Sequence, residues 1–148
     1  MTPDQLLGYK QQELDIYEEY ADIISKQHVG LECMPGHLTI LKRALYTLAE
    51  SGHRDILIEN IKIVKGGLRF YYEGGDELLY SKIKMLEQAS FQVCNICGDV
   101  GEKSKEDFTT VRCLRHKDLS IPVLTNDQQQ YIIDREIKMR RKFQKEPE

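Results

Sequence analysis

Hydrophobic residues recur at helical spacing in three parts of the first 90 residues. The first part starts at Thr2, whose capping-box partner is Gln5, and continues to about residue 27. The second spans about residues 37–51, and the third follows the capping residue Asp76 to about residue 90. These patterns predict three helices, with inward positions at Leu6, Leu7, Leu14, Tyr17, Tyr20, Ala21 and Ile24, at Leu38, Leu41, Ala44, Leu45 and Leu48, and at Leu79, Ile83, Leu86 and Ala89.

The stretch between the second and third helices has the pattern of strands. Residues 55–64 are rich in β-branched side chains, and residues 68–73 alternate apolar with polar or charged groups. Because residues 65–67 read Lys-Gly-Gly, we expect an antiparallel hairpin. Its inner face would carry Leu68, Phe70 and Tyr72, and its outer face Arg69, Tyr71 and Glu73.

The C-terminal part of the chain predicts an extended segment and a last helix. Residues 120–124 read as extended, and a helix is expected from near Asn126, with Gln129 completing its cap. The predicted fold class is therefore α+β, with helices flanking a short antiparallel β-hairpin. We divide the chain into a core (1–92), a cysteine segment (93–119) and a basic C-terminal helix (120–148).

Composition places the chain among ordinary globular domains. It has 148 residues, of which 41% are hydrophobic and 30% charged, and its net charge of -3 argues against a general polyanion binder. The charge is uneven, since residues 1–33 carry -5 and residues 135–145 carry +5. The sequence starts without a secretory signal pattern and has no membrane-length apolar run, so we expect a cytoplasmic protein with reduced cysteines.

The clearest chemical signal is a pair of ligand clamps. Cys94 and Cys97 form the first clamp and Cys113 and His116 the second, which gives the pattern C-x2-C-x15-C-x2-H. Gly98 can take the positive φ angle that the turn after the first clamp needs. Three thiolates and an imidazole match tetrahedral zinc, and four protein ligands leave no open position, so the pattern predicts a structural Zn²⁺ site.

Other interpretations of this segment remain open. A redox pair would need the strand and helix context of a thioredoxin-like motif, and catalytic zinc would need an open coordination position. The surrounding fold is expected to be a zinc ribbon or a treble clef whose last helix starts near His116. The spacing alone does not choose between these two folds.

Two further patterns are interpreted as structural. The string GGDE at residues 74–77 also occurs in cyclic-dinucleotide cyclases, but helical periodicity follows it here, so a helix cap is expected. Cys33 is predicted to be a buried thiol, with His28, His37 and His53 as ordinary surface histidines rather than a second metal site or partners of a catalytic cysteine.

Two surfaces are candidates for binding partners. The outer hairpin face, with Arg69, Tyr71 and Glu73 beside Lys62, has the residue types of protein-binding hot spots, although the N-terminal helix could instead cover it. The basic last helix could contact nucleic acid through its cations, or carry them only because the helix dipole favours them. The residues concerned are Arg140, Arg141 and Lys142.

The sequence resembles a family of small proteins from bacteria and their phages. The resemblance covers about residues 30–117 and rests on the GGLRFY string at 66–71 and on the CxxCG…CxxH pattern that follows it. It implies a zinc knuckle with the same four ligands, but no reaction. We find no carboxylate pair, nucleophile–base set or phosphate loop. The expected function is thus non-enzymatic: a zinc-binding protein-interaction module, phage- or mobile-element-encoded and acting on a host or defence protein, with nucleic-acid binding as the alternative.

Overall fold

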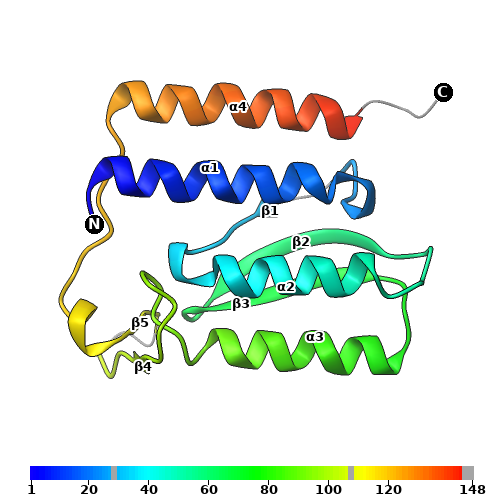
Figure 1. Ribbon diagram of the computed structural model, residues 1–148, viewed down its shortest axis with the longest axis horizontal. Coiled ribbons are helices and arrows are strands. Elements are labelled where there is room, and N and C mark those ends of the chain that lie inside the picture. Colours follow the sequence, from blue (N-terminus) through cyan, green and yellow to red (C-terminus); the bar gives the residue numbers. More distant parts are fainter. Residues whose placement is uncertain (28–29, 107–108, 145–148) are drawn as a thin grey trace.

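The computed structural model describes residues 1–27, 30–106 and 109–144, and these form an α+β fold, as predicted (Figure 1). The α-helices in this part of the chain are α1 (Pro3–Glu19), α2 (Leu38–Ala49), α3 (Glu77–Ser90) and α4 (Asn126–Gln144). The strands are β1 (Gly30–Leu31), β2 (Leu57–Val64), β3 (Gly67–Glu73), β4 (Glu102–Lys103) and β5 (Val111–Arg112). Short 3-10 helices lie at η1 (Ala21–Ile23), η2 (Pro35–His37) and η3 (Leu114–His116).

The predicted hairpin forms two strands of a three-stranded sheet with the order β1-β2-β3, in which β2 is central. Strands β2 and β3 are antiparallel, and the turn between them consists of Lys65 and Gly66. The φ angles of these two residues are 52° and 86°, the pair of positive values found in a type I′ turn. Strand β1 pairs with β2 in parallel, so the sheet is mixed.

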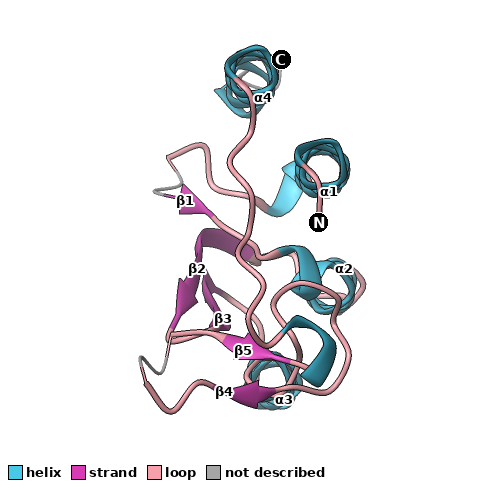
Figure 2. Cartoon of the chain, turned by 90° about the vertical axis from the view of Figure 1, so that its left-hand side faces the viewer, coloured by secondary structure: helices cyan, strands magenta, loops and turns pink. Residues whose placement is uncertain are grey.

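The main core lies between the sheet and helices α2 and α3. The face of the sheet that α2 and α3 cover carries Leu68 and Phe70, as expected for the inner face of the hairpin. Helix α1 packs against α2, and α4 lies along α1 at the outside of the molecule (Figures 1 and 2). The side chains without any exposed surface include Leu41, Ala44, Leu45, Leu48, Ile58, Ile61 and Leu68.

The first helix is shorter than predicted. It ends at Glu19, and the residues that follow leave the helix to join the sheet. The backbone N–H of Ser25 donates to the carbonyl of Ile58 at 2.8 Å, and Ile24 forms a parallel bridge with Ile58. The expected extension to residue 27 is therefore wrong, because pairing with β2 satisfies this backbone better than another helical turn would.

The inward face of α3 is more polar than predicted. Leu79 and Ile83 are buried and Leu86 is half-buried, but Ala89 is exposed. Glu87 and Ser90 are buried instead, and their side chains accept the backbone N–H groups of Phe70 (2.9 Å) and Leu68 (2.7 Å). These are N–H groups on the free edge of β3, so α3 caps the sheet edge as well as packing against its face.

The N-terminal cap of α3 is the predicted one, whereas that of α4 differs from the prediction. The Asp76 carboxylate accepts the N–H of Leu79 at 2.9 Å, so the GGDE string is a helix cap, as expected. At α4, Thr125 and Gln128 form the reciprocal capping box, one residue earlier than the predicted pair Asn126 and Gln129. The Gln129 amide donates to the Leu124 carbonyl instead.

Candidate metal centre

The first ligand clamp is a tight turn that the sequence can adopt because of Gly98. The N–H of Gly98 donates to the Cys94 carbonyl at 2.9 Å, and its φ angle is +83°, as predicted. The N–H of Cys94 in turn donates to the Asp99 carbonyl at 2.6 Å. The second clamp follows the short β4–β5 hairpin and lies on η3, where the His116 N–H donates to the Cys113 carbonyl at 3.1 Å. Both clamps are thus held by their own backbone.

The structure brings the four predicted ligands together. One ligand atom from each of Cys94, Cys97, Cys113 and His116 lies within 4.8 Å of all the others. The Sγ atoms of Cys97 and Cys113 are 3.7 Å apart, and His116 Nδ1 lies 3.6 Å from the Cys94 sulfur and 3.2 Å from the Cys113 sulfur. All the cysteines in this group are free thiols.

These separations fit a tetrahedral zinc ion. With Zn–S bonds of about 2.3 Å and Zn–N bonds of about 2.0 Å, a tetrahedron has sulfur–sulfur edges of about 3.8 Å and sulfur–nitrogen edges of about 3.6 Å. A disulfide would instead need sulfurs about 2.05 Å apart. The Cys₃His cluster is therefore compatible with a structural zinc site in which the protein supplies every ligand.

The thiols of the first clamp have pKa values displaced in opposite directions. Burial opposes ionisation of Cys94, but backbone N–H groups of the cluster and the His116 ring outweigh it and lower the Cys94 pKa to about 6. For Cys97, burial and the neighbouring Cys113 and Cys94 sulfurs raise the pKa to about 11. A bound cation would remove this conflict, because a thiol that coordinates a metal is deprotonated. The Arg115 guanidinium, 3.9 Å from the Cys97 sulfur, adds positive charge at the rim.

The segment around the ligands has features of a ribbon. Strands β4 and β5 pair antiparallel through Glu102–Arg112 and Lys103–Val111. The last clamp lies on the three-residue helix η3, and the next α-helix starts only at Asn126. Among the described residues, the α-helix near His116 that a treble clef would need is therefore absent, and a short hairpin lies between the clamps.

Asn95, between the first two ligands, joins this segment to the rest of the protein. The side chain has no exposed surface. Its amide group donates to the Gly66 carbonyl in the β2–β3 turn at 3.0 Å. Its carbonyl oxygen accepts the Val111 N–H at 2.8 Å and the Arg112 guanidinium at 3.0 Å. One side chain therefore connects the first clamp, the second hairpin and the main sheet.

The loop before α2 makes a second contact between the cysteine segment and the rest of the protein. The N–H of Gly36 donates to the Asn95 carbonyl at 2.7 Å, and a Cβ atom at position 36 would lie 1.9 Å from the Cys94 carbonyl oxygen. His37 is completely buried, and its Nε2 lies 3.2 Å from the Ser90 carbonyl. Burial lowers the His37 pKa to about 4. The prediction of a surface histidine is wrong here, because the cysteine segment covers η2.

The remaining residues of the second predicted cluster lie apart. Cys33 is buried as expected, and burial raises the pKa of its thiol well above the usual range, which disfavours a nucleophilic role. His53 lies 3.4 Å from Asp76 at the start of α3. His28 lies outside the described residues. In the described part of the chain, the only group of three or more potential ligands is the Cys₃His cluster.

The outer face of the hairpin is open. Helices α2 and α3 lie on the other side of the sheet, and α1 packs against α2 and α4 rather than here (Figure 2). Tyr71 and Glu73 are exposed and Arg69 is half-buried. The Lys62 ammonium lies 5.9 Å from the centre of the Tyr71 ring, and the Arg69 guanidinium 5.7 Å from that of Phe91. The predicted row therefore forms a surface, whereas the alternative of a covered face is wrong.

One basic residue of α4, Arg135, pairs with an acidic residue of α1. Arg135 is bonded to Asp15, and its guanidinium also donates to the Gln11 carbonyl. Arg140 and Arg141 are exposed, whereas Lys142 lies beyond the residues whose side chains are described. The pair with Asp15 therefore offsets one positive charge of α4, while Arg140 and Arg141 remain on the surface.

The roles of Asn95, Gly36 and His37 were not predicted from the sequence, but one further residue could have been recognised there. Glu13 occupies a position on the apolar stripe of α1 and is buried. A charged residue on an apolar stripe is a recognisable exception, since buried carboxylates are rare without a partner.

No described helix has the length and apolarity that crossing a membrane requires. Comparisons of the chain with protein-family models, with curated proteins and with solved structures found no match.

Proposed function

We propose that the chain is a non-enzymatic zinc-binding protein whose open sheet face binds another protein. The observation that carries the proposal is the outer face of the hairpin, defined here as Lys62, Arg69, Tyr71 and Glu73. It combines an exposed aromatic ring with cationic and acidic groups on two paired strands, and 47% of Tyr71 is exposed. Tyrosine and arginine supply much of the binding energy in protein interfaces.

The β3 edge of the sheet is an unsuitable docking site for a partner strand, which favours the face. Glu87 and Ser90 occupy the N–H groups of Phe70 and Leu68 that a partner strand would need. The Cys₃His cluster has a supporting role in this proposal: Asn95 binds the turn between β2 and β3, so the metal segment fixes the end of the hairpin that carries the face.

A partner screen with matched variants tests the proposal. We expect that a photoreactive residue placed at position 62 will form a covalent crosslink to one specific protein, which is then recovered together with the purified chain. Tyr71→Ala should weaken that complex at least about tenfold, as expected for a central aromatic contact. Tyr46→Ala is the matched control, because Tyr46 is exposed on α2, away from the face. Equal loss in both variants, or the absence of any partner at low salt, would contradict the proposal.

The same material separates the nucleic-acid alternative. If α4 bound phosphates, mixed DNA and RNA would bind with an affinity that falls steeply with salt, and replacing Arg140 and Arg141 by glutamine would abolish binding. We expect no such binding, because Asp15 of α1 already pairs with Arg135 of this helix.

A further inference from the structure

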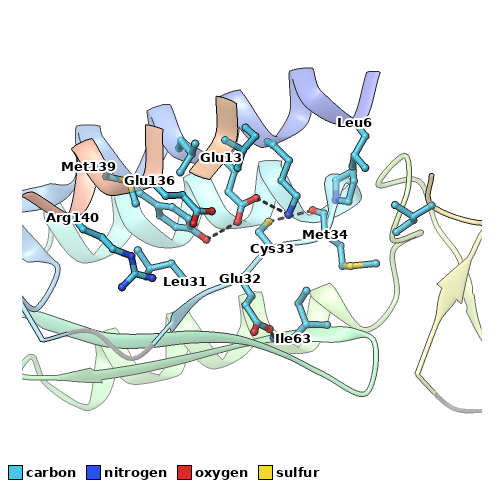
Figure 3. A pocket seen from close by; sticks show the side chains of 16 residues that line it. Leu6, Glu13, Leu31, Glu32, Cys33, Met34, Ile63, Glu136, Met139 and Arg140 are labelled. Carbon is cyan, nitrogen blue, oxygen red and sulfur yellow. Dashed lines mark hydrogen bonds and ion pairs between the residues drawn. The ribbon is translucent and has the colours of Figure 1, made fainter. Parts of the chain in front are cut away.

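A cavity of about 400 Å³ lies between α1, α4 and the segment that follows β1. Its volume is within the range of small-molecule sites. Most of its wall is aliphatic, with Leu14, Leu31 and Ile132 among the lining residues, while Glu13, Lys10 and Tyr17 provide polar atoms on one side. Figure 3 shows Glu13 extending from α1 into this space toward Cys33.

The Glu13 carboxylate is buried but poorly satisfied. Only 7% of the residue is exposed. Its two polar contacts are long: the Tyr17 hydroxyl at 3.4 Å and the Lys10 ammonium at 3.6 Å. A good O–H···O bond is about 2.7 Å, and a carboxylate can accept about four hydrogen bonds. Glu13 therefore retains acceptor capacity toward the cavity.

A second carboxyl group near Glu13 favours a positive ligand. Glu136 approaches Glu13 from α4, whereas Glu32, which also lines the cavity, turns its carboxylate toward the Ile63 N–H at 3.5 Å (Figure 3). Lys10 and Arg140 supply the positive charges of the lining, and Arg140 is exposed. The groups that face Glu13 also include Tyr17 and the Cys33 thiol. In the described residues, these side chains do not form a cluster with the spacing of metal ligands.

We propose that this cavity binds a small organic cation in which a primary ammonium group is joined to an aliphatic chain. The ammonium group would donate to Glu13, with Glu136 as its second counter-charge, and the chain would lie against the aliphatic wall. A primary ammonium has three donors, which suits a carboxylate with unfilled acceptor positions. The site is separate from both the metal cluster and the outer face of the hairpin.

A proton balance distinguishes this ligand from others. Burial raises the pKa of Glu13 to about 7. Lys10 and Tyr17 lower this pKa, and Glu136 raises it by a smaller amount than burial does. Near pH 7 a bound ammonium would favour the ionised carboxylate, so binding would release protons. A bound carboxylic acid anion would instead favour the protonated form and take protons up.

Calorimetry with three probes of equal chain length tests the proposal. At pH 7, in buffers of different ionisation enthalpy, we expect hexylammonium to bind one site per chain with proton release, and hexanol and hexanoate to bind at least about tenfold more weakly. Glu13→Gln should lose at least about tenfold in affinity together with the proton release. Glu136→Gln should lose less, and Glu19→Gln, an exposed acid of the same helix, should bind like the native chain.

Several results would overturn the assignment. These are the absence of saturable binding, equal affinity for hexanol, tighter binding of hexanoate with proton uptake, or unchanged affinity in a folded Glu13→Gln variant. Circular dichroism of each variant checks its folding. Because Tyr71 lies elsewhere, Tyr71→Ala should leave hexylammonium binding unchanged, so this test and that of the proposed function fail independently.

Discussion

Residues 3–90 and residues 93–117 hold their shape by different means. The first region buries a continuous set of large aliphatic side chains, such as Leu41, Leu45 and Ile58, between a sheet and helices. The second has its own small cluster, in which the buried residues are Cys94, Ile96 and Cys113, and two of these are candidate metal ligands. So few buried side chains cannot offset the conformational entropy of ordering the segment.

We therefore expect the second region to depend on two other sources of stability. One is a metal ion held by the Cys₃His cluster, which would tie its two clamps to each other. The other is the contact with the first region, where Asn95 and Gly36 connect the clamps to the hairpin turn and to η2. The comparison indicates that a local fold can be specified by coordination and buried hydrogen bonds where hydrophobic burial is insufficient.

Loss of the metal should have the largest effect. We expect one zinc ion per chain, and its removal by chelation or by Cys94→Ser should cost the second region on the order of 10 kcal/mol, the scale of structural zinc sites. Hydrogen exchange should then show lost protection at Asn95, Gly98 and Gly101, with protection retained at Ile61 and Phe70 in the main sheet.

Cys33→Ala is the matched control for this experiment. It removes a buried thiol outside the cluster, so the zinc content should be unchanged. Full protection of residues 93–117 in metal-free protein would show that the two regions do not differ in the way described.

The second largest effect should come from separating the two regions without touching a ligand. In Gly36→Ala, the added Cβ would lie 1.9 Å from the Cys94 carbonyl oxygen, so the backbone of one region must move. We expect the free energy of unfolding to fall by more than about 3 kcal/mol, the upper part of the range for overpacked sites. Denaturant unfolding of the zinc-loaded protein measures this, and a loss below about 1 kcal/mol would contradict a tight contact.

The sequence predicted those parts of the two regions whose interactions are between residues close together along the chain. The helices and the hairpin were predicted because their apolar patterns repeat over several turns or residues. The ligand set was recognisable because each clamp is defined by neighbours two residues apart. Strand β1 was missed, since two residues are too few to show a period, and α1 was predicted too long because pairing with Ile58 is not visible locally.

The contact between the regions could not be predicted for a related reason. Asn95 and Gly36 are far apart in the sequence. Asparagine and glycine are also common in ordinary turns, so their identity alone does not indicate a contact. His37 likewise is an unremarkable residue until the cysteine segment covers it. Glu13 is the intermediate case, because its place on an apolar stripe was visible although its cavity was not.

A change in pH should alter the free energy of unfolding by a similar or smaller amount, through Glu13 in the first region. The pKa of Glu13 is raised by burial from 4.5 to about 7, so the folded state binds the proton more tightly than the unfolded state. Stability should therefore fall as the pH rises from about 5 to 8, by up to about 3 kcal/mol. We expect Glu13→Gln to remove this part of the pH dependence in urea unfolding, and Glu19→Gln to keep it. Parallel pH profiles for all three proteins would contradict the raised pKa.

The smallest effect should stabilise the first region and leave the second unchanged. Gly8 lies inside α1, and a Cβ atom there would meet no other atom within 4 Å. Alanine is favoured over glycine in a helix by about 1 kcal/mol, so Gly8→Ala should raise the free energy of unfolding by about that amount. Zinc affinity, measured by competition with a chelator, should not change, because α1 supplies none of the four ligands. The same substitution at Gly36 should destabilise the protein, so the two variants separate the effect of replacing a glycine from the effect of disturbing the contact between the regions. A zinc affinity that rose with the stability of α1 would instead show that the two regions are energetically coupled through this helix.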